Sequence, residues 1–184
     1  PSVNLNIKYM ENNYNLNIHE LFMSRALELA GKGRGRVSPN PMVGCVIVKD
    51  GEIIGEGYHK EFGRAHAEVV AFKNARLDPL DATAYVTLEP CCVSGKTPPC
   101  TEAFIHNSIS EVYIGMLDPN PKINGKGVEA LQKAGIKVHV GVLAEESIRL
   151  NRPFEKWMTT GMPWVIAKVV QSADGYMGKD SNTS

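Results

Sequence analysis

One histidine and two cysteines have the side-chain chemistry and spacing of a catalytic metal site. His66 is followed at Cys91 by a cysteine that comes directly after a proline, and Cys100 lies nine positions further on. A catalytic zinc ion usually has three protein ligands and keeps a fourth position for water. One imidazole and two thiolates match that number, so we predict a zinc centre formed by His66, Cys91 and Cys100.

Glu68, two residues after His66, is predicted to move protons rather than to bind the metal. Near a helix start, its carboxylate can lean over the open position of the metal. There it can take a proton from water that the metal activates, and pass it to a ring nitrogen and a departing amine. This chemistry is hydrolytic deamination. Nucleobase deaminases carry a His-x-Glu motif followed by Pro-Cys-x-x-Cys, and the longer spacing from Cys91 to Cys100 departs from that signature.

The elements that must position these residues alternate along the chain. Apolar spacing predicts helices over 18–32, 66–76, 100–107, 127–134 and 144–160, and strands over 42–48, 52–58, 82–88, 111–116, 136–140 and 163–170. The pattern indicates a three-layer α/β/α sandwich whose mixed sheet of about five strands opens with a hairpin. Strand ends and helix starts converge at one edge of such a sheet, which is where the predicted ligands fall. The strand over 163–170 has no obvious partner.

The composition bounds the function. Twenty basic residues balance twenty acidic ones, and this balance disfavours a nucleic-acid partner. No apolar run approaches the ~18 residues of a membrane span. Four cysteines, three of them clustered, without a secretory signal indicate metal chemistry in the cytoplasm rather than disulfides. We expect a poorly ordered leader over 1–17, a deaminase domain over 18–160, and a linker with the start of another domain over 161–184.

Four motifs in order carry a resemblance to a known family: His66-Ala-Glu-Val-Val-Ala71, Val86-Thr-Leu-Glu-Pro-Cys91, Gly95-Lys-Thr-Pro-Pro-Cys100 and Leu117-Asp-Pro-Asn-Pro121. Together they resemble the deaminase domain of the riboflavin-pathway bifunctional deaminase/reductase, over about residues 20–160. The resemblance implies a cytidine deaminase-like fold with Zn²⁺. It also implies deamination of 2,5-diamino-6-ribosylamino-4(3H)-pyrimidinone 5′-phosphate, a small pyrimidine ribotide, with its 2-amino group replaced by a carbonyl oxygen.

The resemblance also implies roles for single residues. It makes His66, Cys91 and Cys100 the zinc ligands and Glu68 the proton shuttle. The positions that match the family's substrate pocket are Asn40, His59, Lys96, Asp118 and Asn120. The segment 163–175 resembles the opening of the family's reductase domain, which would use NADPH. Nearly all of that domain is absent from this sequence, so we expect no reduction by this chain.

Several alternatives stay open at this point. The family usually has Ser-His after the first cysteine, where this chain has Cys92-Val93, so substrate preference could differ. Another deaminase of the same fold, acting on cytosine, guanine or a tRNA adenosine, is one rival. A zinc-stabilised binding module with Cys92 as a fourth ligand is another. Asp118 and Asn120 could simply turn a loop. Trp157 and Trp164 are interpreted as packing residues and Cys45 as a core residue, and a homo-oligomer is expected.

Overall fold

The computed structural model describes residues 17–93 and 98–175, and a five-stranded sheet forms the centre of this part. The strands are β1 (Gly44–Lys49), β2 (Glu52–Tyr58), β3 (Thr83–Leu88), β4 (Glu111–Met116) and β5 (Lys137–Val140). Their order is β2-β1-β3-β4-β5, with β1 antiparallel to both of its neighbours and β3, β4 and β5 parallel. The predicted mixed sheet that opens with a hairpin is confirmed.

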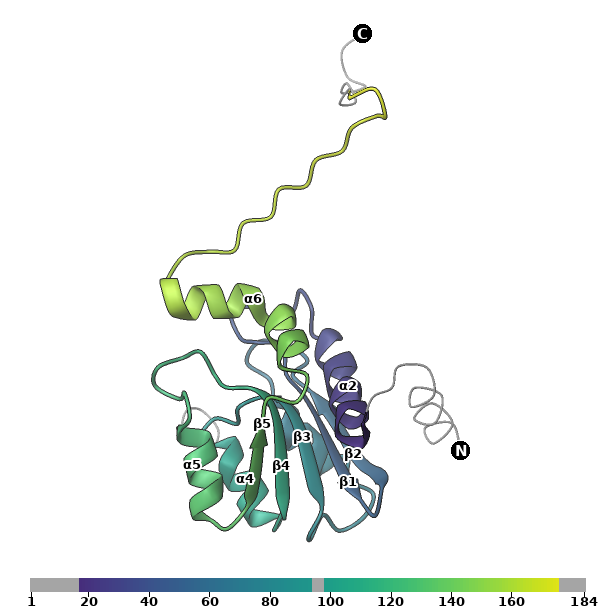
Figure 1. Ribbon diagram of the computed structural model, residues 1–184, viewed down its shortest axis with the longest axis vertical. Coiled ribbons are helices and arrows are strands. Elements are labelled where there is room, and N and C mark those ends of the chain that lie inside the picture. Colours follow the sequence, from purple (N-terminus) through teal and green to yellow (C-terminus); the bar gives the residue numbers. More distant parts are fainter. Residues whose placement is uncertain (1–16, 94–97, 176–184) are drawn as a thin grey trace.

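Helices cover both faces of the sheet (Figure 1). They are α2 (Ile18–Gly31), α3 (Ala67–Lys73), α4 (Cys100–His106), α5 (Lys126–Lys133) and α6 (Ala144–Thr160). One apolar core joins α3, α4 and α5 to the sheet, and a second joins α2 to the opposite face. Successive β1 side chains enter different cores, Ile47 the first and Val46 the second, as the pleat of a strand requires. The three-layer prediction is therefore confirmed.

A capping box explains why α2 begins where the sequence predicts. The Asn17 side chain accepts hydrogen bonds from the backbone N–H groups of His19 and Glu20, while the Glu20 carboxylate accepts one from the Asn17 backbone. These bonds satisfy amide groups that have no partner within the helix. The expected leader over 1–17 otherwise lies outside the described residues.

Glycine in β2 allows α3 to lie against the sheet. A Cβ atom added at Gly57 would stand 2.3 Å from the Ala67 carbonyl oxygen and 2.4 Å from the Ala71 nitrogen. No side chain fits at such distances, so the helix that carries Glu68 approaches the sheet as closely as its backbone permits.

The last helix has a kink that the sequence only partly predicts. Pro153 lies inside α6, and the backbone leaves helical angles at Asn151, two residues earlier. Proline removes a backbone donor and crowds the preceding turn, which accounts for a break at this point.

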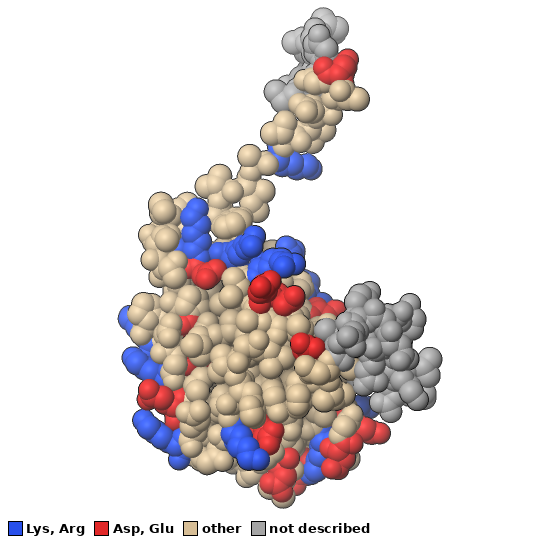
Figure 2. Space-filling view, viewed as in Figure 1, with Lys and Arg blue, Asp and Glu red and all other residues tan. Residues whose placement is uncertain are grey.

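The prediction of a strand over 163–170 is wrong. Residues 162–172 have no regular secondary structure and project away from the body (Figure 1 and Figure 2). Val165 and Ile166 are 79% and 78% exposed. A strand needs a neighbour for its backbone hydrogen bonds, and no other described strand lies beside this segment.

Among the described helices, none has the length and apolar character needed to cross a bilayer.

Candidate active site

His66, Cys91 and Cys100 meet at the edge of the sheet where β3 ends, and we call them the ligand cluster. His66 is the N-cap of α3, Cys91 follows β3, and Cys100 is the first residue of α4. His66 Nδ1 lies 3.1 Å from Cys100 Sγ and 3.7 Å from Cys91 Sγ. Two ligands of a tetrahedral zinc ion, with bonds of ~2.0–2.3 Å, stand roughly 3.5 Å apart. The spacing and the nitrogen–sulfur donor set both fit zinc.

The surroundings of Cys91 favour its thiolate. The thiol of Cys100 and the His66 imidazole both hydrogen-bond to its sulfur and lower the Cys91 pKa, and the Cys100 backbone N–H, 3.3 Å from the sulfur, adds to this. Conversely, the hydrogen bond to Cys91 and burial raise the pKa of Cys100. The pair therefore carries one ready thiolate, which is the form that binds metals.

Among the described residues, the group of histidine, cysteine and acidic side chains with metal-ligand spacing is the ligand cluster itself. Cys92 is not part of this cluster. The structure places Cys91, the cysteine preferred from the sequence, beside His66 and Cys100. Three donors leave room for a fourth, non-protein ligand, as in a catalytic site. Cys45 lies in the core with 0% exposure, as predicted.

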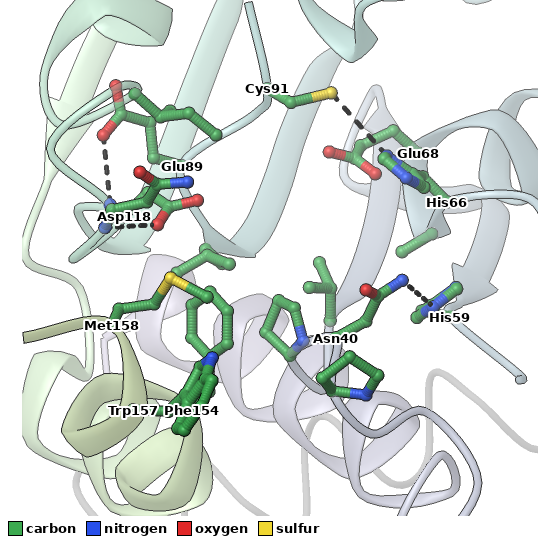
Figure 3. Close-up of a pocket in the computed structure, with 17 residues that line it drawn as sticks. Asn40, His59, His66, Glu68, Glu89, Cys91, Asp118, Phe154, Trp157 and Met158 are labelled. Carbon is green, nitrogen blue, oxygen red and sulfur yellow. Dashed lines mark hydrogen bonds between the residues drawn. The ribbon is translucent and has the colours of Figure 1, made fainter. Parts of the chain in front are cut away.

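Glu68 lies in the first turn of α3 beside the ligand cluster (Figure 3). It is only 4% exposed, and burial raises the pKa of its carboxyl group. Because burial disfavours the charged form, this carboxyl holds a proton more readily than an exposed glutamate does, which suits a group that accepts and returns protons.

Asn40 and His59 face the cavity as a hydrogen-bonded pair (Figure 3). The His59 Nδ1–H donates to the Ala65 carbonyl, so the other ring nitrogen, Nε2, accepts from the Asn40 side-chain amide at 3.1 Å. Burial lowers the His59 pKa, which favours this neutral ring. The arrangement leaves the Asn40 carbonyl oxygen as an acceptor for a ligand.

Asp118 and Asn120 turn a loop and also line the cavity. The loop-turning interpretation is therefore confirmed, and their contact with substrate stays a prediction. The Asp118 carboxylate accepts from the Asn120 N–H at 2.8 Å, and the Asn120 side chain accepts from the Lys122 N–H at 3.0 Å. Asp118 is 5% exposed, and burial raises its pKa to about 6. Both residues are among those that line the cavity.

Glu89 is a residue whose role sequence reasoning missed. Its buried carboxylate accepts four backbone N–H groups, at distances of 2.9–3.3 Å, from Asp118, Gly125, Gly127 and Val128. A carboxylate at the start of α5 is also favoured by the helix dipole. The bonds hold the loop that carries Asp118 against the end of β3. The motif around Cys91 contained this glutamate, but nothing local in the sequence indicated its distant partners.

The cavity has a volume of about 310 Å³ and a wall that the sequence did not predict. Phe154, Trp157 and Met158 of α6 form this wall, and we call them the α6 wall. Figure 3 shows their side chains on the far side of the cavity from Glu68. Trp157, interpreted from the sequence as a packing residue, is 50% exposed.

Two sequence expectations concern the loop before Cys100. Lys96, the predicted cation of the pocket, lies outside the described residues. Val93 is described and is 50% exposed, so it fills no core position where the family usually has histidine.

This fold and this site define a class of protein. The family model for the cytidine and deoxycytidylate deaminase zinc-binding region matches residues 16–116, more than half of the chain, and the chain belongs to that family. A dCMP deaminase from the cyanophage S-TIM5, 20% identical with a TM-score of 0.54, shares the fold.

Within that class the relatives are riboflavin-pathway proteins, which confirms the resemblance seen in the motifs. The riboflavin biosynthesis protein RibD of Escherichia coli is 50% identical over 90% of this chain and 45% of its own length. A Thermotoga maritima diaminohydroxyphosphoribosylaminopyrimidine deaminase/5-amino-6-(5-phosphoribosylamino)uracil reductase is 51% identical, with a TM-score of 0.77 over 80% of this chain and 43% of that one. The chain therefore spans less than half the length of these relatives.

Proposed function

We propose that this chain is a zinc-dependent deaminase of 2,5-diamino-6-ribosylamino-4(3H)-pyrimidinone 5′-phosphate. The observation that carries the proposal is the placement of a buried carboxyl, Glu68, beside a three-donor cluster that opens on a cavity. The family membership and the RibD relatives support the substrate class.

The ligand cluster would hold the ion, which supplies Lewis-acid activation of water when bound. Glu68 would take one proton from that water and pass it to the ring nitrogen next to the amino-bearing carbon. The water oxygen then bonds to this carbon, the carbon–nitrogen bond breaks, and Glu68 delivers the second proton to the departing ammonia. The balance is one water consumed and one ammonia released.

The other cavity residues would bind and orient the ribotide. Asn40, whose amide is held by His59, offers a carbonyl oxygen to a ring N–H group. Asp118 and Asn120 are proposed to contact polar groups of the substrate from the loop after β4. Lys96 remains the proposed partner of the phosphate, since a dianion needs a cation and a lysine in this loop supplies one.

Metal binding has a test that does not depend on activity. Zinc content per chain should fall from about one to near zero in Cys91→Ser, because the site then has two donors. Cys92→Ser is the matched control and should retain zinc. Loss of zinc in the Cys92 variant would instead favour a four-ligand structural site.

A turnover assay tests the substrate. Zinc-loaded protein should release ammonia from the ribotide and give a product about one mass unit heavier, amino exchanged for oxygen. Turnover of cytosine, guanine or a tRNA adenosine, with none of the ribotide, would contradict the proposal in favour of another deaminase activity. Zinc binding without turnover of any of these would favour a binding module.

Three finer points belong with this proposal. Since the described cysteines are free thiols, a reducing cytoplasmic location is proposed. A homo-oligomer is proposed because the apolar segment 163–170 is exposed. NADPH-dependent reduction is assigned to the domain whose opening this segment resembles, and not to the cavity described above.

A further inference from the structure

The α6 wall and the ligand cluster face each other across one cavity but come from different parts of the chain. The ligand cluster lies within residues 16–116, the segment that matches the general deaminase model. Helix α6 lies outside that segment. The ligand cluster therefore lies in the segment that this chain shares with cytidine and deoxycytidylate deaminases. The α6 wall is an addition to it.

We propose that the α6 wall is a substrate-selecting subsite that binds the portion of the ribotide remote from the amino-bearing carbon. This inference rests on the proposed function. The amino-bearing carbon must lie at Glu68 and the ligand cluster, so the opposite wall meets the rest of the molecule (Figure 3). Aromatic rings provide flat apolar surfaces on which bases and sugars stack. Trp157 is half-exposed and keeps a surface open to a ligand.

The charges of the cavity define how this subsite works. Its described lining contains the acidic residues Glu68, Glu89 and Asp118 and neither lysine nor arginine. The α6 wall therefore acts by stacking and apolar contact rather than by ion pairing. Stacking is little affected by salt, whereas attraction between exposed charges is screened.

Asn151 is the positioning residue for the α6 wall. Its side chain, 1% exposed, accepts a hydrogen bond from the Met42 N–H at 2.8 Å and donates one to the Met42 carbonyl at 2.9 Å. It stands at the kink of α6, three residues before Phe154. Met42 lies two residues after Asn40. One pair of hydrogen bonds thus sets the separation of the α6 wall from the loop that carries Asn40.

Tryptophan fluorescence tests the contact directly. The sequence has two tryptophans, so Trp164→Phe leaves Trp157 as the single reporter. Combined with Glu68→Gln to prevent turnover, this protein should show a saturable change in emission when titrated with the ribotide. The matched protein with Trp157→Phe and Trp164 retained should show none. Unchanged Trp157 emission at ribotide concentrations that calorimetry shows to be saturating would overturn the inference.

Kinetics test the selection. Trp157→Ala should lower kcat/KM for the ribotide about tenfold, mainly through KM, as expected for the loss of one stacking contact. The loss should be equal at low and high salt, and Trp157→Phe should restore most of the activity. Asn151→Asp, which keeps the acceptor but loses the donor, should shift KM in the same direction by less. Unchanged KM in Trp157→Ala would contradict the inference.

The two proposals fail separately. If wild-type protein releases ammonia from the ribotide while the Trp157 variants behave as wild type, the subsite is wrong and the proposed function stands. If wild-type protein releases no ammonia, the proposed function fails. The fluorescence titration with the same ribotide then still decides whether the α6 wall binds it.

Discussion

The Asn40 side-chain amide donates a hydrogen bond to Nε2 of His59, 3.1 Å away, and the opposite ring nitrogen of His59 donates to the backbone. These two hydrogen bonds fix both the tautomer of the His59 ring and the direction of the Asn40 amide. A carbonyl oxygen that points into the cavity is thus oriented before any ligand arrives.

Removing the acceptor on His59 should therefore weaken substrate binding. His59→Leu leaves the Asn40 amide free to rotate, and we expect kcat/KM for the ribotide to fall about tenfold, about 1.4 kcal/mol of transition-state stabilisation. His106→Leu, at the exposed end of α4, is the matched control and should stay within twofold. Equal kinetics for the two variants would show that the His59–Asn40 bond does not orient the substrate.

Glu89 should be a large contributor to stability. Glu89→Gln replaces one carboxylate oxygen by an NH₂ group that faces backbone N–H donors, so at least one buried hydrogen bond is lost. We expect the free energy of unfolding to fall by about 3 kcal/mol, measured by urea denaturation. Glu129→Gln changes a glutamate whose side chain is 65% exposed, and should cost under about 0.5 kcal/mol. A small and equal decrease in the free energy of unfolding in both variants would contradict the role assigned to Glu89.

Asp118 should impose a pH dependence on stability. Its pKa is raised from 3.8 to about 6, chiefly by burial, so between those values the native protein binds more protons than the unfolded chain. Its contribution to the free energy of unfolding is therefore complete at low pH and declines as the pH rises towards 6. Asp118→Asn removes this decline while keeping the acceptor for the Asn120 N–H. In urea denaturation from pH 4 to 7, the free energy of unfolding of the variant should rise relative to that of wild type as the pH rises. Parallel plots of this free energy against pH would refute the raised pKa of Asp118.

Gly57→Ala should disturb the site from a distance. The added Cβ would meet the backbone of α3, at 2.3 Å from the Ala67 oxygen, so the helix must shift outward and carry Glu68 with it. We expect a loss of about 2 kcal/mol in stability, with reduced kcat in the folded fraction. Gly31→Ala is the control, since a Cβ there meets nothing within 4 Å. Circular dichroism melting curves that coincide for both variants would contradict the close packing.

The sheet, its helices and the ligand cluster could be predicted because their signals are local. Each strand and helix shows its own apolar period. His66, Cys91 and Cys100 stand at element ends that a partly parallel sheet brings to one edge. The predicted strand over 163–170 failed because strand formation depends on a partner that no local pattern supplies.

The α6 wall and the hydrogen bonds of Glu89 could not be predicted for a different reason. The contact between Asn151 and Met42 joins residues 109 positions apart. Apolar spacing in α6 predicts a helix but does not indicate which part of the protein its C-terminal half contacts. Glu89 likewise stood in a recognised motif, yet its partners lie 29–39 residues later. Such contacts follow from the assembled fold rather than from any stretch of sequence.

The most direct test of the central claim is ammonia release from the ribotide by wild-type protein and by Glu68→Gln, with zinc content measured on the same samples. Glutamine keeps the size of the side chain but cannot shuttle a proton. We expect about one zinc per chain in both proteins, equal unfolding curves, and at least a 10²-fold loss of turnover in the variant. Turnover in Glu68→Gln within a few-fold of wild type, with zinc retained, would contradict the proton-shuttle role of Glu68.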